Sequence, residues 1–257
     1  MKQNKKINGD LYGQKYFEEH EFSYRDENRE DIKRILELLG VKKSDRVLEI
    51  GCGLGVLLSK IPSKKKIGIE ISDFAIKECQ KKGLNVAKVN AEKELPFRDS
   101  SFDIVIMNEV ISHLKNPEFV LRECYRILEP GGKIILTAPV RSLFFYNIST
   151  THIHEMNTRE LKTLLEESGF TILVHEVCGI SFLYPLLENI FFKPFRFLRK
   201  VLGKKEKNGV RLIDSCHSFA DKTILKPLGI YRKFLLNLGT NQLVLGEKKR
   251  KDKNEEN

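Results

Sequence analysis

The chain has 257 residues, of which 41% are hydrophobic and 31% are charged, which is enough apolar material for one sizeable core. No charge-free run of about 18 apolar residues occurs, which argues against a spanning helix, and the basic N-terminus, MKQNKKINGD, lacks the apolar stretch of a signal peptide. The cysteines form no CxxC pair, which disfavours a disulfide framework or a metal site and fits a reducing, cytoplasmic compartment (Cys52, Cys79, Cys124, Cys178 and Cys216).

The formal net charge of +10 is concentrated near the C-terminus. Residues 190–257 contain 17 Lys and Arg against 7 Asp and Glu, whereas residues 1–189 carry no net charge. A local excess of this size calls for a local explanation, such as an anionic partner.

The predicted elements begin with a polar, aromatic cap over residues 1–27 and a helix over residues 28–39 that Gly40 ends. Strands and helices then alternate. The strands are predicted at 46–50, 66–70, 84–89, 102–107, 133–138 and 170–177, and the helices at 54–60, 72–82, 117–128 and 158–168. The Pro130-Gly131-Gly132 sequence predicts a turn before the fifth strand. This alternation indicates an α/β fold with a doubly wound parallel sheet covered on both faces, whose core domain spans residues 28–177.

The alternation stops after residue 177. Residues 178–240 are rich in Phe, Leu, Lys and Arg and are predicted to form a helical insertion or cap between strands six and seven. The QLVLG sequence, within 241–247, predicts the last core strand, and the charged tail at 248–257 is expected to be disordered.

The stretch RVLEIGCGLGVLLSKI, residues 46–61, joins a strand to a helix through three glycines. Their spacing is G-x-G-x-G, which matches neither the dinucleotide fingerprint nor the nucleotide P-loop. Such a turn brings bare backbone close to a ligand at the carboxyl end of the first strand. Glu49 precedes the turn, where a carboxylate suits a ligand that carries an ammonium group.

Three more polar positions follow neighbouring strands. Glu70 ends the second strand, where a carboxylate can accept hydrogen bonds from both ribose hydroxyls. Asn90, Ala91 and Glu92 follow the third strand, where a side-chain oxygen and a backbone N–H suit an adenine. Asn108, Glu109 and Val110 lie at the end of the fourth strand and face the same crevice.

These motifs together resemble the class I S-adenosylmethionine-dependent methyltransferases, in particular the small-molecule branch with the quinone methylases. The matching stretches are VLEIGCGLG, IGIEIS, VNAEKELPF, SFDIVIMNEVISHL, ILEPGGKIILTAP and HIHEMNTRELKTLLEESGF. The resemblance implies a Rossmann-like sheet of seven strands, the seventh antiparallel and beside strand six, and S-adenosylmethionine as the cofactor. The residues expected to hold it are Glu49, Gly51, Cys52, Gly53, Gly55, Glu70, Ile71, Asn90, Ala91, Glu92 and Asn108.

Three histidines follow the strands near the expected acceptor site. His113 can shape that site or simply cap a loop, and His152 and His154 precede the 158–168 helix. Imidazole can serve as a general base near neutral pH, although many methyl transfers need only alignment. His113 and His154 are predicted to act at the acceptor. Tyr12, Tyr16 and Phe17 can form a lid over the cofactor or pack the first helix.

The segment 181–205, SFLYPLLENIFFKPFRFLRKVLGKK, mixes large apolar groups with cations. It favours a cap over the active site or a peripheral contact with an anionic membrane on its inner face. The predicted acceptor is therefore a small molecule or a lipid-linked compound. A nucleic-acid partner is disfavoured because no RNA-binding fold is evident. The alternatives are an RNA methyltransferase and a non-catalytic cofactor-binding subunit, and the oligomeric state stays open.

Overall fold

The computed structural model describes residues 9–19, 30–140, 152–154, 156–178 and 241–250, and every structural statement below refers to these. The chain divides into two compact units. One contains residues 1–139, 148–175 and 243–257, and the other contains 140–147 and 176–242. Most of the second unit, including the predicted insertion and the 181–205 segment, lies outside the described residues, as does the end of the tail.

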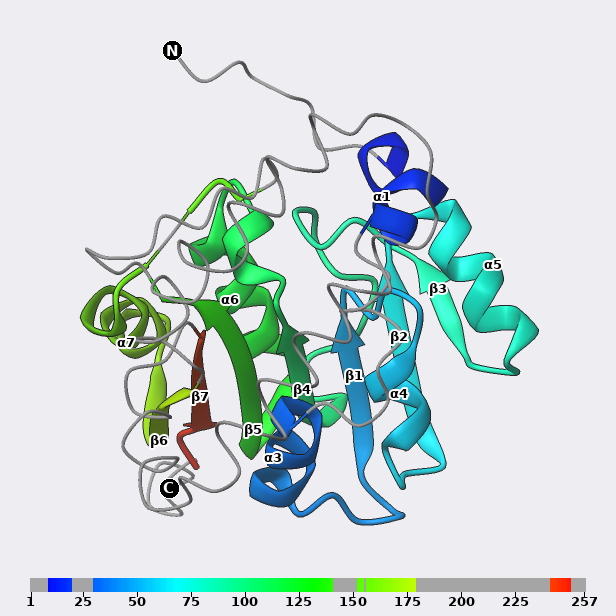
Figure 1. Ribbon diagram of the computed structural model, residues 1–257. Coiled ribbons are helices and arrows are strands. Elements are labelled where there is room, and N and C mark those ends of the chain that lie inside the picture. Colours follow the sequence, from blue (N-terminus) through cyan, green and yellow to red (C-terminus); the bar gives the residue numbers. More distant parts are fainter. Residues whose placement is uncertain (1–8, 20–29, 141–151, 155, 179–240, 251–257) are drawn as a thin grey trace, which may run out of the picture. The chain divides into compact units, whose positions relative to one another are not determined.

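Seven strands form one mixed sheet in the order β3-β2-β1-β4-β5-β7-β6 (Figure 1). Neighbours from β3 through β5 pair in parallel, as the alternating pattern predicted. The last strand along the chain is inserted between β5 and β6. The strands are β1 (Arg46–Ile50), β2 (Lys65–Glu70), β3 (Val86–Lys88), β4 (Phe102–Asn108), β5 (Leu128–Pro139), β6 (Phe170–Cys178) and β7 (Asn241–Lys248).

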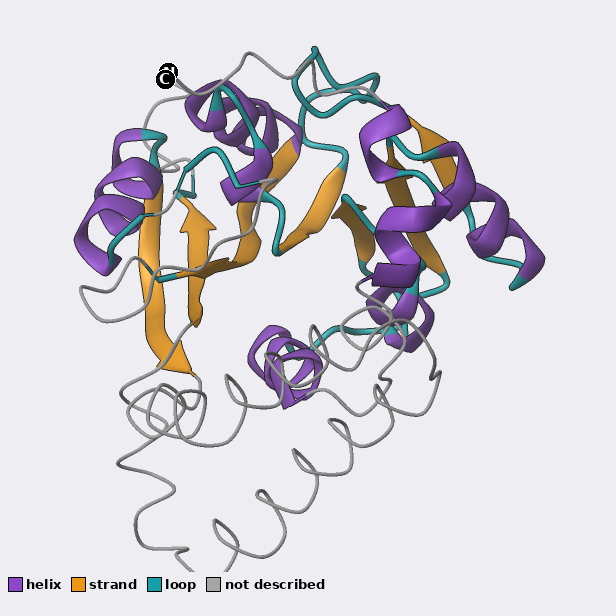
Figure 2. Cartoon of the chain, turned by 45° about the horizontal axis from the view of Figure 1, so that its top comes forward, coloured by secondary structure: helices purple, strands orange, loops and turns teal. Residues whose placement is uncertain are grey.

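Helices cover both faces of this sheet, as expected for a doubly wound fold (Figure 2). The described helices are α1 (Gln14–Glu19), α3 (Glu30–Leu39), α4 (Val56–Lys60), α5 (Asp73–Lys81), α6 (Pro117–Ile127) and α7 (Thr158–Glu167), with 3-10 turns η1 (Gly9–Tyr12) and η2 (Ile111–His113). Each face of the sheet has its own apolar core, because successive residues of a strand point to opposite faces.

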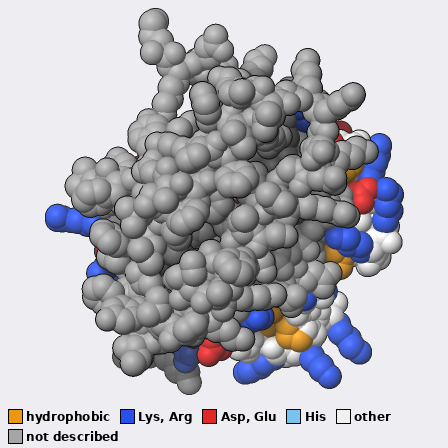
Figure 3. Space-filling model, viewed as in Figure 1, with side chains coloured by type: hydrophobic (Ala, Val, Ile, Leu, Met, Phe, Trp, Pro, Cys, Tyr) orange, Lys and Arg blue, Asp and Glu red, His pale blue; other side chains and the backbone are white. Residues whose placement is uncertain are grey.

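Strand alternation assigns the core residues to the two faces. One core joins the sheet to α3, α4 and α5 through Val47, Ile104, Ile106, Ile35 and Leu58. The other joins it to α6 and α7 through Leu48, Val105, Met107, Leu121 and Leu165. Several lysines in and around α4 and α5 are exposed, namely Lys64, Lys65, Lys77, Lys81 and Lys88. Figure 3 shows blue Lys and Arg side chains among the described atoms on the side where Figure 1 draws these helices.

Most element bounds shift by one or two residues from the sequence prediction, and two of the differences have a clear physical reason. The helix after β1 begins at Val56, because Gly55 adopts a left-handed conformation with φ 75°. The predicted turn at residues 130–132 is instead part of β5. Phe102 pairs with Leu128 and Ile104 with Lys133, so residues 129–132 form an irregularity within the strand rather than a separate turn.

Helix starts follow the expected capping chemistry. The Ser72 hydroxyl accepts a hydrogen bond from the Ala75 N–H and begins α5, as predicted. Asn157 forms a capping box with Glu160 at the start of α7. None of the described helices combines the length and the apolar character that crossing a bilayer requires.

Candidate functional site

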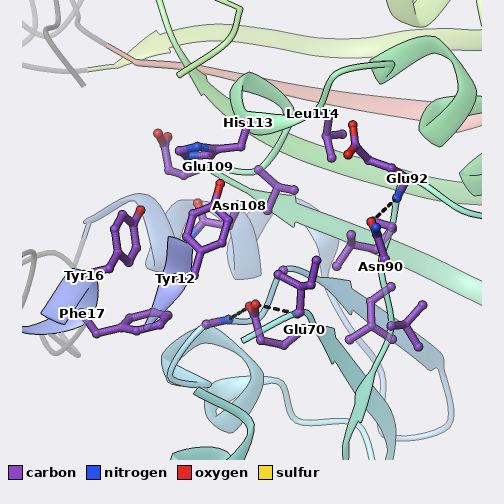
Figure 4. A pocket seen from close by; sticks show the side chains of 18 residues that line it. Tyr12, Tyr16, Phe17, Glu70, Asn90, Glu92, Asn108, Glu109, His113 and Leu114 are labelled. Atoms are coloured by element: carbon purple, nitrogen blue, oxygen red, sulfur yellow. Dashed lines mark hydrogen bonds between the residues drawn. The ribbon is translucent and has the colours of Figure 1, made fainter. Parts of the chain in front are cut away.

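A pocket opens at the carboxyl ends of β1, β2 and β4, where open α/β sheets bind ligands (Figure 4). It spans about 750 Å³ when its open mouth is included. Eight of the predicted cofactor residues line it, namely Gly51, Gly53, Glu70, Ile71, Asn90, Ala91, Glu92 and Asn108.

The glycine turn after β1 is held in place by backbone hydrogen bonds. The Gly51 N–H donates to the Ile69 carbonyl at 2.8 Å, and the Cys79 thiol donates to the Gly53 carbonyl at 3.2 Å. Gly51 has φ 66°, and a Cβ there would lie 2.5 Å from Val110 Cγ2. A side chain would therefore strain the backbone and collide with the pocket wall.

Glu70 organises this turn from the end of β2. Its Oε2 accepts a hydrogen bond from the Gly53 N–H at 2.9 Å. Its Oε1 accepts from the N–H groups of Ile71 at 2.7 Å and Ser72 at 2.9 Å. A carboxylate offers about four acceptor positions, so one remains for a hydroxyl of the ligand. The buried Glu70 can thus fix the turn and also bind a ligand hydroxyl.

Glu49, Cys52 and Gly55 lie outside the pocket lining. Glu49 is buried on β1, on the strand face that packs against α4, and its Oε2 has no hydrogen-bond partner among the described residues. Burial raises the pKa of Glu49 well above its usual range. The hydrogen bond to Cys79, together with burial, raises the pKa of the Cys52 thiol, which keeps it unreactive.

The loop after β3 is held by its own polar groups. The Asn90 Oδ1 accepts a hydrogen bond from the Glu92 N–H at 2.9 Å, and the Glu92 carboxylate accepts one from the Lys115 N–H. The Asn90 oxygen keeps a second acceptor position for an adenine amino group, as the sequence predicted, and its NH₂ group can donate to a ring nitrogen.

The end of β4 is fixed by a buried hydroxyl on β5. Thr137 Oγ1 donates to Asn108 Oδ1 at 2.7 Å and accepts from the Glu109 N–H at 3.0 Å. Glu109 adopts a left-handed backbone with φ 59°, which is uncommon for a residue other than glycine. It also lines the pocket, on the crevice side where the sequence placed it, although it was not among the predicted cofactor residues.

Aromatic side chains from the N-terminal cap cover the pocket. Tyr12 and Tyr16 meet edge to face at 5.1 Å between ring centroids. Phe17 is buried and packs on Phe74 of α5 at 5.8 Å. Burial raises the pKa of Tyr12, so its phenol keeps its proton at neutral pH. The position of Tyr12, Tyr16 and Phe17 at the pocket therefore matches the alternative in which they form a lid.

The two histidines predicted to act at the acceptor, His113 and His154, lie in different places relative to the pocket. His113 lines the pocket, and its ring lies 6.0 Å from the Tyr12 ring. His154 lies outside the lining, with its Nε2 3.4 Å from the Lys115 carbonyl oxygen. The ring of His152 instead packs against that of His113. Among the described residues, no group of three or more His, Cys, Asp or Glu could hold a metal ion.

The residues present fit S-adenosylmethionine. The bare backbone at Gly51 and Gly53 leaves room for the methionine portion, and Glu70 retains an acceptor position for a ribose hydroxyl. The loop at Asn90 can meet an adenine edge, while the lid aromatics close over the ligand. A sequence signal for the lid existed in the cluster of aromatics before α3, and the signal for Glu109 was its place directly after the fourth strand.

Comparison with known proteins points to one family. Residues 48–136 match the family model described as "Methyltransferase domain". The uncharacterized protein MJ1123 of Methanocaldococcus jannaschii is 36% identical over 165 residues, which cover 61% of this chain and 76% of that protein. Demethylmenaquinone methyltransferase of Staphylococcus aureus is 32% identical over 112 residues, covering 40% of this chain and 46% of that one.

Several curated relatives are longer than the matched region. The alignment spans about half of two mycobacterial proteins named as S-adenosylmethionine-dependent methyltransferases, at 52% and 51% of their length. A crystal structure of a SAM-dependent methyltransferase from Archaeoglobus fulgidus superposes with a TM-score of 0.61 at 20% identity. It covers 91% of this chain and all of that one, which shows a shared fold.

Proposed function

We propose that this chain, which belongs to the class I S-adenosylmethionine-dependent methyltransferases and uses S-adenosylmethionine as its cofactor, transfers the methyl group to a small-molecule or lipid-linked acceptor. The observation that carries the proposal is the pocket itself. A bare glycine turn, a buried carboxylate at the end of β2 and an aromatic lid lie around one cavity. We assign cofactor binding to the eight predicted residues that line it.

The acceptor class rests on the sequence and on one relative. The 181–205 segment combines large apolar side chains with lysines and arginines, the composition of an interfacial element. The staphylococcal relative is named for an apolar quinone substrate. An apolar acceptor delivered at an anionic membrane surface accounts for both observations, and the C-terminal excess of positive charge supports that contact.

Cofactor binding is tested by titration calorimetry with S-adenosylhomocysteine. Glu70→Ala removes the hydrogen bond to the Gly53 N–H of the turn and the two to the Ile71 and Ser72 N–H groups, and it should weaken binding sharply. Asp73→Asn is the matched control, because Asp73 lies three residues away but is exposed and pairs with Lys88. Equal affinity in the two variants would remove Glu70 from the cofactor site.

The acceptor is sought with methyl-labelled S-adenosylmethionine and separate lipid, small-molecule and RNA pools. Label in the lipid or small-molecule pool is expected. Label in RNA, with a rate that falls steeply with salt, would replace the proposal by RNA methylation. Cofactor binding without label in any pool would indicate a non-catalytic subunit.

Membrane contact is tested by flotation with vesicles that contain phosphatidylglycerol. At low salt the chain should float with these vesicles and stay behind with vesicles of phosphatidylcholine alone, because the expected attraction is electrostatic. A chain that stays in the dense fraction with both vesicle types would refute the membrane contact and leave the methyltransferase activity untouched.

A further inference from the structure

Two segments far apart in the sequence place a second histidine against His113 of the pocket wall. The N–H groups of Ile153 and His154 both donate to the Ser112 carbonyl, at 2.8 Å and 3.1 Å. These bonds fix the connection before α7 onto η2. The ring of His152 consequently lies 4.9 Å from that of His113, at an interplanar angle of 70°.

This contact lies at the part of the pocket away from the ribose carboxylate. In Figure 4, His113 and Glu109 lie across the cavity from Glu70, and the Glu109 side chain extends beside the His113 ring. Tyr12 meets the His113 ring nearly edge to face, at 86°. Apart from Asn108, which ends β4, the residues assigned to the cofactor lie at or directly after the ends of β1, β2 and β3, so the wall at His113 is left for the acceptor.

We propose that His113 and His152 form an imidazole pair that takes the proton from the methyl acceptor, with His113 as the catalytic residue and His152 as its positioning residue. The proposal rests on the proposed function and narrows the substrate class. The acceptor is a hydroxyl, a quinol or an ammonium nitrogen, whose nucleophile must lose a proton. A thioether acceptor has no such proton and would not need the pair.

The step balances without any further reactant. The acceptor atom forms a bond to the methyl carbon while the carbon–sulfur bond breaks, and that electron pair stays on sulfur, leaving a neutral thioether. The proton of the acceptor goes to an imidazole nitrogen of His113. The contact with His152 restricts the orientation of the His113 ring, so the nitrogen that faces the cavity stays aligned with the acceptor.

Several groups face the pair from other elements, and each affects its titration. Glu109 lies on the same loop, Tyr12 belongs to η1, and Glu92 lines the pocket from the loop after β3. The carboxylates favour the imidazolium, whereas each imidazolium disfavours protonation of the other ring. The two rings therefore titrate as a coupled pair.

The coupling is tested by following the imidazole Cε1–H signals during a pH titration by NMR, with S-adenosylhomocysteine bound. His152→Phe keeps an aromatic ring against His113 but removes the second charge. Two charges about 5 Å apart at an effective dielectric constant of 20–80 shift a pKa by roughly 0.6 to 2.4 units. His152→Phe should therefore raise the pKa of His113 by about one unit.

The matched control is His154→Gln, which changes a histidine in the same connection that lies outside the pocket. It should leave the titration of His113 unchanged. An unchanged pKa of His113 in His152→Phe, or an equal shift in both variants, overturns the pair. His152→Gln serves the same purpose should His152→Phe fold poorly.

The catalytic role is read from the pH dependence of label transfer into whichever pool accepts methyl. His113→Gln should abolish the acid limb of the kcat profile. His152→Phe should move that limb to higher pH and lower kcat more than it changes KM. A wild-type profile without an acid limb overturns the proton transfer. If no pool accepts label, the proposed methyltransferase activity is refuted instead. The NMR titration then still tests whether His113 and His152 form a coupled pair.

Discussion

The two glutamates that flank the glycine turn should respond in opposite ways to the same substitution. Glu49 and Glu70 are both buried, and each ends or nearly ends a strand beside the turn. Replacement by glutamine keeps the shape of either side chain and removes its ability to ionise. The hydrogen bonds around each carboxyl group decide the outcome.

At Glu70 the substitution removes an acceptor that the backbone needs. With its oxygen toward Ile71 and Ser72, a glutamine would turn its NH₂ group toward the Gly53 N–H, and two donors would face each other. A lost hydrogen bond to a charged group costs about 1.5–3 kcal/mol. We expect Glu70→Gln to lower the free energy of unfolding by about 2–3 kcal/mol and to weaken cofactor binding at least about tenfold.

At Glu49 the substitution removes a group whose ionisation destabilises the folded chain at high pH. Burial, followed by the nearby Cys79 and Glu70, raises the pKa of Glu49, whereas a hydrogen bond from the Leu58 N–H lowers it. The unfolded glutamate loses its proton near pH 4.5, while the folded one keeps it to higher pH. Wild-type stability therefore falls as the pH rises above that value, by up to about 1.4 kcal/mol per unit, until the folded pKa is reached.

Urea unfolding at pH 5 and pH 8, with calorimetry using S-adenosylhomocysteine, separates the two cases. Glu49→Gln should equal or exceed the wild type in stability at pH 8, should gain less at pH 5, and should bind the ligand almost normally. Glu70→Gln should lose stability and affinity at both pH values. The reasoning is refuted if Glu70→Gln matches the wild type, or if Glu49→Gln is destabilised equally at pH 8.

Three further substitutions test other contacts. Gly51→Ala should lower the free energy of unfolding by about 2–4 kcal/mol in thermal unfolding, since its Cβ would lie 2.5 Å from Val110. Gly40→Ala, where φ is 56° but the space is open, should lower it by only about 1–2 kcal/mol. Similar losses in the two variants would contradict the close approach of Gly51 to Val110. Phe17→Ala should weaken ligand binding about tenfold by loosening the lid on Phe74, and calorimetry with an unchanged affinity would exclude the lid. Arg46→Gln should cost about 1 kcal/mol at pH 7, after screening of its partly exposed pairs with Asp103 and Glu129. Because the Arg46 hydrogen bond lowers the pKa of Asp103, that deficit should shrink below about pH 4, and a deficit that persists at pH 3 would rule out the ion pair as its cause.

Local patterns predicted the fold because each element has a local cause. The Ser72 cap and the glycines after α3 and α5 can be read from neighbouring residues. The irregularity in β5 could not, because it depends on Phe102 pairing with Leu128 at one end and Ile104 with Lys133 at the other. A proline and two glycines read as a turn unless the partner strand is known.

The site shows the same division between local and distant causes. Strand alternation places Glu49 on the same face of β1 as Val47, but the sequence did not show that this side chain lies outside the pocket lining, because the neighbouring Gly51 lines it. No local rule distinguishes His152 from His154. Which of them reaches His113 depends on the two hydrogen bonds to the Ser112 carbonyl, a contact across about forty residues that spacing does not encode.

The charges of the pocket connect the cofactor with the proposed proton transfer. Among the lining residues that the structure describes, Glu70, Glu92 and Glu109 are acidic and none is Lys or Arg. These carboxylates stabilise a sulfonium, and for that reason they would oppose a reaction that simply removed its charge. A proton moving from the acceptor to His113 restores a positive charge beside Glu109 as the sulfonium disappears. The charge is thus relocated within one acidic cavity, and the carboxylates that bind the donor need not oppose the reaction.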